Sequence, residues 1–219
     1  MTCIVGLALQ GNVFLGGDRA AVDGATIFTA AEPKVFRRGP FIVGYTTSFR
    51  MGQLLEHQLT VPELVNTKDA GSYMRGTFVD ALRKLFADAG WRSKRDEREI
   101  GGAFLVGFAD RLWHVDEDFQ VTRWDEPYAA VGSGAACALG ALGGIYCLEA
   151  ALFLTPHQVL LAALRAAALH TTTVRGPFDI IALHEQAPIP HPSPIGGMTA
   201  AASSAPAPPP PSADPTGAS

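Results

Sequence analysis

Charged residues are scarce in this sequence. They make up 17% of the 219 residues, and the net charge is −4. Basic residues are scattered, and their densest run, RSKRDER at 92–98, alternates with acids, which is typical of a solvated loop. The composition excludes an extended basic surface, so we expect no nucleic-acid partner.

Cysteine is also rare and unpatterned. The three cysteines are an odd number, and their spacing fits neither a disulfide framework nor a zinc site. A reducing compartment is the simplest explanation, and we expect a cytoplasmic protein. Five of the six histidines likewise lack ligand spacing, so we expect no metal and no cofactor; they are His57, His114, His157, His170 and His184.

Targeting signals are missing as well. The opening MTCIVGLALQ lacks the basic region and small-residue cleavage site of a secretory signal. One stretch, 135–154, approaches the length of a membrane span, but it contains Glu149 and several glycines. A buried helix layer explains it better, and we expect no membrane partner.

Apolar residues, by contrast, are plentiful. They form 47% of the chain, enough for one domain with a sizeable core. From about Glu185 the composition changes abruptly to proline, alanine and serine, which cannot offset the entropy of ordering. We therefore predict a folded domain at 1–185 and a disordered tail at 186–219 that is dispensable for folding.

Hydrophobic periodicity predicts an α+β domain in which strands and helices come in blocks. Alternating β-branched segments indicate strands, and apolar spacings of three and four indicate helices. The expected strands are 2–9, 13–17, 26–29, 34–36 and 41–45, followed by 103–108, 112–115, 128–131 and 178–183. The expected helices are 49–59, 70–89, 135–146 and 156–170, with a polar loop at 91–100. Two packed sheets with a helical layer outside each would satisfy this order.

The second residue offers a nucleophile. Removal of Met1 would leave Thr2 with a hydroxyl and a free α-amine on one carbon skeleton. Such an amine titrates near pH ~8, so a useful fraction is a neutral base that can take the hydroxyl proton, directly or through a water. On its own this signal is weak, because many chains begin with Met-Thr.

Two charged residues follow at regular intervals. Asp18, in LGGDR, comes sixteen residues after Thr2, and Lys34, in EPKV, comes sixteen after that. The chain has only four lysines, so a lysine at this place is not a casual match. A hairpin would bring Asp18 beside Thr2, and the next strand would bring Lys34 alongside. A buried ammonium there would stabilise an alkoxide-like hydroxyl, and Asp18 would keep the ammonium charged. Considered singly, Asp18 is an ordinary turn residue and Lys34 an ordinary surface cation.

With these intervals the sequence resembles proteasome β subunits and the bacterial heat-shock peptidase. The segments that show the resemblance are TCIVGLAL, VFLGGDRAAV, EPKVF and the Gly-Ser-Gly segment YAAVGSGA. The last of them places the family serine at Ser133. LGAL, LRAAALH and RGPFDIIAL are further similar segments, so the resemblance covers about 2–184. It implies the four-layer αββα sandwich of N-terminal-nucleophile hydrolases.

The resemblance also implies a function and a set of site residues. It implies a threonine endopeptidase that forms an acyl-enzyme on Thr2, with the oxyanion held by the backbone N–H of Thr47 or Ser48. The peptide substrate would add as a strand along Ala21 and Val22. Implied partners are an unfolded protein or peptide as substrate, further copies in a homo-oligomeric ring, and an ATPase unfoldase.

Three departures from the family pattern stand out. The oxyanion turn reads YTTS at 45–48 where relatives carry a glycine, which alters the adjoining pocket. The family's Asp-x-x-Ser-Gly segment, which contacts the threonine amine and the Gly-Ser-Gly serine, is replaced by TTTVRG at 171–176, where hydroxyls would have to substitute for the carboxylate. A single methionine precedes the threonine, so activation needs an aminopeptidase, as in the bacterial heat-shock peptidase.

Two other functions remain open from the sequence. The first is a non-catalytic ring subunit of the same fold, against which the set Thr2, Asp18 and Lys34 argues. The second is an acylase-like amidohydrolase, which would cleave small amides but not peptides. Cys3 follows the nucleophile directly, so strand alternation predicts that its side chain lies on the opposite face, in the core.

Overall fold

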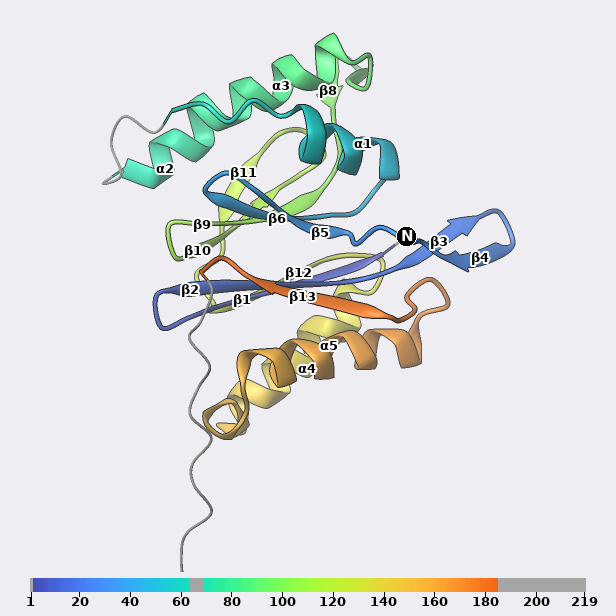
Figure 1. Cartoon of the computed structure of the whole chain (residues 1–219), viewed down its shortest axis with the longest axis vertical. Coiled ribbons are helices and arrows are strands. Elements are labelled where there is room, and N and C mark those ends of the chain that lie inside the picture. Colours follow the sequence, from blue (N-terminus) through green and yellow to red (C-terminus); the bar gives the residue numbers. More distant parts are fainter. Residues whose placement is uncertain (1, 64–68, 185–219) are drawn as a thin grey trace, which may run out of the picture. The chain divides into compact units, whose positions relative to one another are not determined.

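The computed structural model describes residues 2–63 and 69–184, and the expected tail at 186–219 lies outside them. The described residues form four layers, a helical layer, two sheets and a second helical layer (Figure 1). The predicted α+β order is therefore confirmed. No helix of the described part is long and apolar enough to cross a membrane.

The first sheet has four strands in the order β12-β1-β2-β13. All three pairings are antiparallel, and β1 lies in the interior of the sheet between β12 and β2. The β1–β2 connection is a two-residue hairpin in which Gln10 and Gly11 both have positive φ, as a tight turn matched to the strand twist requires. The strands are β1 Cys3–Leu9, β2 Asn12–Asp18, β12 Tyr128–Gly132 and β13 Phe178–Ala182.

The second sheet has five antiparallel strands in the order β11-β10-β9-β6-β5. Its strands are β5 Val35–Arg38, β6 Phe41–Tyr45, β9 Phe104–Phe108, β10 Arg111–Val115 and β11 Val121–Arg123. The inner faces of the two sheets meet in an aliphatic layer that includes Ile4, Leu15, Ile42 and Leu105, all fully buried. Burial of each such side chain contributes on the order of 1.5–3 kcal/mol.

Helices cover the outer face of each sheet (Figure 1). An aromatic cluster that includes Phe41, Phe78, Phe86 and Trp113 joins the five-stranded sheet to the helices between residues 49 and 88. These are α1 Phe49–Gln53, η1 Leu54–Gln58, α2 Ala70–Tyr73, η3 Met74–Phe78 and α3 Val79–Asp88. The four-stranded sheet is covered by α4 Ala135–Cys147 and α5 Pro156–His170, joined by η4 Ala150–Phe153. A capping box of Thr155 and Gln158 begins α5.

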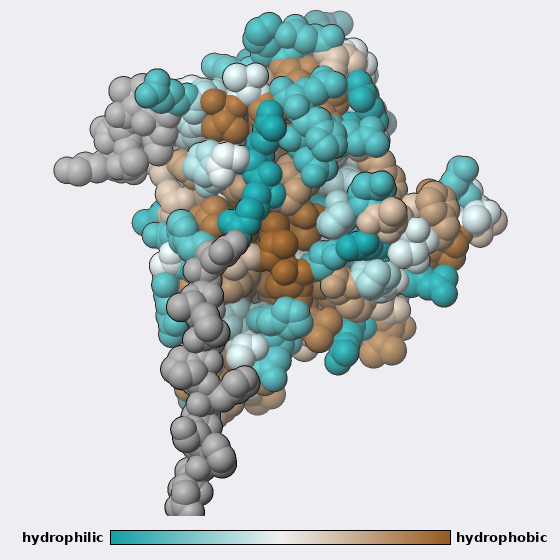
Figure 2. All heavy atoms as spheres, viewed as in Figure 1, coloured by the Kyte–Doolittle hydropathy of each residue, from teal (hydrophilic) through white to brown (hydrophobic). Residues whose placement is uncertain are grey.

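Two short hairpins lie outside the sheets. β3 Ala20–Asp23 and β4 Thr26–Thr29 form one, which projects from the domain and carries apolar residues among its polar ones (Figure 2). β7 Ser93–Arg95 and β8 Arg98–Ile100 form the other. It replaces the loop expected at 91–100, because Asp96 and Glu97 both adopt positive φ and close a two-residue turn without the usual glycine.

Candidate active site

Thr2 lies at the entrance of β1, where the surrounding backbone holds it tightly. Its side chain and backbone are 4% exposed, and its carbonyl oxygen accepts a hydrogen bond from the Gly134 N–H at 3.2 Å. The nearby Gly132, opposite Cys3 in the sheet, has φ of +98°, and a Cβ there would lie far inside contact distance of the Thr2 carbonyl oxygen. Only glycine fits such a close approach without a shift of the backbone.

Lys34 comes directly before β5 and points at Thr2. Its Nζ lies 2.9 Å from the Thr2 Oγ1, and the residue is 1% exposed. The Lys34 carbonyl oxygen accepts from the Tyr45 N–H at 3.0 Å, which anchors its backbone to β6. The distance between ammonium and hydroxyl is that of a direct hydrogen bond.

Asp18 ends β2 and lies behind the lysine. Both of its carboxylate oxygens are 3.2 Å from the Lys34 Nζ. Oδ1 also accepts from the Cys3 N–H and Oδ2 from the Ala20 N–H, each at 2.9 Å. Asp18 is fully buried, so these donors replace the water that a carboxylate would otherwise bind. The Asp18 carboxylate thereby connects the starts of β1 and β3 to Lys34.

The Lys34 ammonium has a complete set of partners. It donates to the Thr2 hydroxyl, the Asp18 carboxylate and the carbonyl oxygen of Ala20, which matches its three N–H groups. The ring centroid of Phe49 lies 5.7 Å from Nζ. Burial lowers the pKa of Lys34, and the charge of Asp18 opposes part of that shift. A buried cation with a lowered pKa is a strong hydrogen-bond donor to the hydroxyl.

Ser133 lies on the other side of Thr2. The Thr2 nitrogen donates to the Ser133 Oγ at 3.1 Å, and the Ser133 hydroxyl lies 3.3 Å from the Thr2 carbonyl oxygen. Its Oγ is also 2.8 Å from the Oγ1 of Thr173, in the segment between α5 and β13. Thr173 thus supplies a hydroxyl where the related sequences were expected to have a carboxylate. The sequence pointed to the stretch 171–176 but did not single out this residue.

The two candidate oxyanion donors differ in the structure. The Ser48 N–H is engaged, since it donates to the Thr46 carbonyl oxygen at 2.6 Å, and the Ser48 hydroxyl caps α1 by accepting from Arg50. Thr47 has φ of +55°, and within residues 2–63 and 69–184 its N–H has no hydrogen-bond partner. The oxyanion hypothesis therefore rests on Thr47 and not on Ser48.

A small cavity of about 70 Å³ opens beside Thr2 and Lys34. Its walls come from the start of β3 and from the segment between β6 and α1: Ala20, Val22, Tyr45, Thr46, Thr47, Ser48 and Phe49. Val22 reaches this cavity, while Ala21 is buried at 2% exposure and pairs with Phe28 of β4. In the described part of the chain β3 pairs only with β4, so its other edge carries no strand.

Cys3 takes no part in this site. Its side chain packs with the cluster under α4 and α5, on the face opposite Lys34, as strand alternation predicted. Burial, with Asp18 nearby, raises the pKa of the Cys3 thiol to about 12. The Thr2 hydroxyl therefore lies against the Lys34 ammonium, and the Thr2 nitrogen lies against Ser133.

No protein-family model matches the sequence, and no curated protein matches it significantly. Solved structures do match. BPH from Thiobacillus denitrificans, solved in complex with epoxomicin, is 18% identical with a TM-score of 0.67, over 83% of this chain and 97% of that one. Eukaryotic HslV from Trypanosoma brucei is 18% identical (TM-score 0.55; 83% and 98% covered). The Gly-1 mutant of Anbu from Hyphomicrobium sp. strain MC1 is 16% identical (TM-score 0.58; 82% and 80% covered).

Proposed function

We propose that this chain, whose fold is the αββα sandwich of proteasome-type N-terminal-nucleophile hydrolases, is a threonine peptidase with Thr2 as its nucleophile. The observation that carries the proposal is the 2.9 Å hydrogen bond from the Lys34 Nζ to the Thr2 Oγ1 in a buried site. Removal of Met1 converts the Thr2 nitrogen, which already lies against Ser133, into a free amine. The Thr2 amine as base, the Thr2 hydroxyl as nucleophile and the Lys34 ammonium then lie next to one another.

The reaction follows from these positions. The neutral Thr2 amine takes the Oγ proton, directly or through a water, while Lys34 stabilises the developing negative charge. Oγ attacks the carbonyl carbon, and the Thr47 N–H donates to the resulting oxyanion. The protonated Thr2 amine then gives this proton to the departing amine of the substrate as the C–N bond breaks, which leaves an ester on Thr2. The Thr2 amine next deprotonates a water, which attacks the ester. As the acid product leaves, the proton returns to Oγ and restores the hydroxyl.

The surroundings support a peptide as substrate. The strand-free edge of β3 offers backbone N–H and C=O groups to an extended chain beside Ala21 and Val22. The cavity of about 70 Å³ next to the nucleophile holds one small side chain. A peptidase of this design acts on unfolded segments, so an ATPase unfoldase is a fitting partner.

Exposed apolar side chains support a homo-oligomer. Leu148, Leu152 and Phe153, around η4, are 81%, 76% and 87% exposed, and Phe28 at the β3–β4 hairpin is 54% exposed. Large apolar side chains gathered at a surface favour contact with another copy. We propose a ring in which these two regions are covered.

A non-catalytic subunit of the same fold is the main alternative. Asp18 and Lys34 also anchor the backbone of Cys3 and Ala20, so a scaffold would have reason to keep both. What favours catalysis is that the Thr2 hydroxyl is one of the three partners of the ammonium. An acylase-like amidohydrolase is the second alternative, and it would use the same machinery.

Intact-mass analysis of the purified protein, with and without epoxomicin, tests the proposal. We expect loss of Met1 and a single adduct on the wild type, no adduct on Thr2→Ala, and partial turnover of a fluorogenic peptide by Thr2→Ser. Thr2→Ala with its fold intact should lose several orders of magnitude in rate. Wild-type turnover by Thr2→Ala would show that Thr2 is not the nucleophile. Neither turnover nor adduct on the wild type after loss of Met1 would favour the non-catalytic alternative, and cleavage of small amides but not peptides would favour the acylase.

A further inference from the structure

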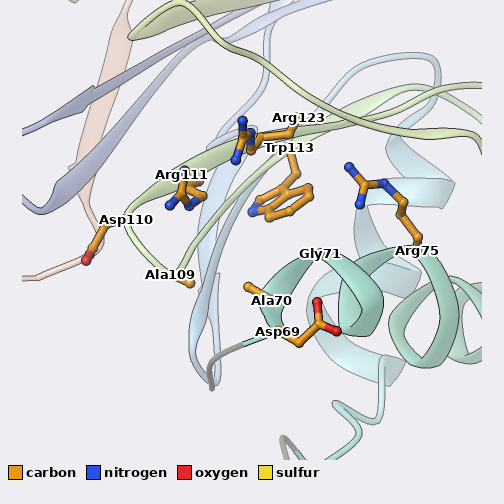
Figure 3. A pocket seen from close by; sticks show the side chains of 9 residues that line it. All are labelled: Asp69, Ala70, Gly71, Arg75, Ala109, Asp110, Arg111, Trp113 and Arg123. Carbon is orange, nitrogen blue, oxygen red and sulfur yellow. The ribbon is translucent and has the colours of Figure 1, made fainter. Parts of the chain in front are cut away.

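A second cavity, of about 470 Å³, lies at the end of the five-stranded sheet away from Thr2. Figure 3 shows its lining. Its lining comes from the start of α2, from Arg75 in η3, from the β9–β10 turn and from strands β10 and β11. The Thr2 site adjoins Tyr45, which pairs with Phe104 at the beginning of β9, whereas this cavity adjoins the turn after Phe108 at the strand's end. It is therefore separate from the candidate active site.

Three arginines surround the cavity. Figure 3 shows Arg75 and Arg123 on opposite sides of Trp113, with Arg111 beside Arg123. Within the residues that the structure describes, Arg75 and Arg111 form no ion pair. Arg123 is 3.8 Å from Asp125, whose side chain is 99% exposed. A pair that open to water is worth little. Arg75 lies close enough to Asp69 for the two charges to interact, so the three guanidiniums are only partly compensated.

The two carboxylates at the cavity compensate the three arginines only in part. The Asp69 Oδ1 accepts from the Ser72 N–H at 2.9 Å as the cap of α2. Hydrogen bonding to the Ser72 side chain and backbone lowers the Asp69 pKa, and the nearby charge of Arg75 adds to that shift. The Asp110 Oδ1 lies 3.6 Å from the His184 Nε2, and Figure 3 shows Asp110 pointing away from the arginines. Three arginines against two carboxylates leave the lining with a net positive charge.

One of the guanidiniums is held in place in advance. The Arg75 Cζ lies 5.7 Å from the ring centroid of Trp113, which is 2% exposed and donates from Nε1 to the Phe108 carbonyl oxygen. Gly71, one helical turn before Arg75, leaves the space for it, since a Cβ there would approach an Arg75 Nη to 2.9 Å. An arginine stacked on a fixed ring loses less freedom when it binds an anion.

We propose that this cavity is a binding site for a phosphate-bearing small molecule that presents at least two linked phosphoryl groups. Guanidinium groups bind phosphate oxygens in pairs, and three of them suit an anion with more charge than one phosphate carries. The volume exceeds what a single phosphate fills and lies in the range of small-molecule sites. The ligand would bind far from Thr2, at the junction of the β9–β10 turn with the helix that follows Asp69.

Calorimetric titration with inorganic pyrophosphate tests the proposal on the full-length protein. We expect one site per chain at about 0.15 M salt, where exposed charges beyond roughly 8 Å are screened. Arg75→Ala and Arg111→Ala should each weaken binding at least about tenfold, the scale of one charge-assisted hydrogen bond. Arg95→Ala removes the same charge from the exposed β7–β8 hairpin and should leave the affinity unchanged.

A charge-neutral variant and a second ligand sharpen the test. Gly71→Ala keeps all charges but moves the Arg75 guanidinium, and it should weaken binding by a few-fold with an unchanged melting temperature. ADP in place of pyrophosphate separates the sources of the phosphoryl groups, because both carry two of them: tighter binding of ADP identifies a nucleotide and equal binding a free polyphosphate. No heat of binding at millimolar pyrophosphate, or an equal loss in Arg95→Ala, would overturn the proposal.

Discussion

The hydroxyl oxygens of Thr173 and Ser133 lie 2.8 Å apart, and Ser133 in turn accepts from the Thr2 nitrogen at 3.1 Å. The three residues form a series of hydrogen bonds from the α5–β13 segment to Thr2. A hydroxyl can both donate and accept, so the series can orient an amine without a carboxylate at its end.

Ser133→Ala should lower kcat/KM by about 10–10², because the amine loses the acceptor that orients its lone pair. Thr173→Val should have a smaller effect in the same direction, and Thr173→Ser, which keeps the hydroxyl, should restore most of the rate. Fluorogenic peptide turnover measures all three. The kcat/KM of Thr173→Val could instead fall as far as that of Ser133→Ala, with Thr173→Ser no higher. That result would show that the packing of Thr173, and not its hydroxyl, matters.

Lys34→Met should abolish turnover and also destabilise the domain. The buried Asp18 would lose its cation, which costs about 3–5 kcal/mol for a pair of this kind. Lys34→Arg should not restore activity, because the wider guanidinium cannot occupy the position of Nζ beside the hydroxyl. Peptide turnover and chemical denaturation give the two readouts.

The double variant Lys34→Met with Asp18→Asn separates the two roles. Removing both charges leaves no unpaired ion, so we expect it to be more stable than Lys34→Met alone and equally inactive. Recovery of activity along with stability would mean that the lysine acts only through the fold.

Gly132→Ala should destabilise the domain by at least about 2 kcal/mol, since alanine is strained at φ of +98° and its Cβ meets the Thr2 carbonyl oxygen. Turnover should fall as Thr2 moves. Gly140→Ala is the matched control, because open space surrounds that position on α4, and there alanine should be neutral or stabilising by up to ~1 kcal/mol. Equal melting temperatures for the two variants would contradict this reading of Gly132.

Cys3 should resist alkylation by iodoacetamide at pH 8 in the folded protein, while the exposed Cys147 reacts. With a pKa near 12 the reactive thiolate is a trace species. Because the folded pKa exceeds the unfolded value of 9.0, the stability that this thiol contributes is complete below pH 9 and is lost as the pH rises toward 12. Peptide mapping after labelling measures both sites, and equal labelling would show that the β1 core opens.

The order of strands and helices could be predicted because most elements carry clear periodicity. The approach of Asp18 and Lys34 to Thr2 could be predicted from strand spacing, and the structure brings all three together. The short strands β3 and β11 were missed, although β4 is equally short and was predicted. The sequence TIFT of β4 is entirely β-branched or aromatic, whereas AAVD of β3 and VTR of β11 are not. The choice between Thr47 and Ser48 depends on one positive φ, which no residue type there announces. The arginine cavity joins positions distant in sequence, so no local pattern marks it.

The double duty of Asp18 has a consequence for how such chains diverge. Its carboxylate holds the N–H groups of Cys3 and Ala20 as well as the lysine, so a substitution there is a folding defect before it is a catalytic one. Selection for a stable fold alone would retain Asp18 and Lys34 over many generations. In related chains without hydrolytic activity, residue 2 would be the first of the three to change. The residue at position 2 would therefore distinguish chains that have lost the activity from chains that keep it.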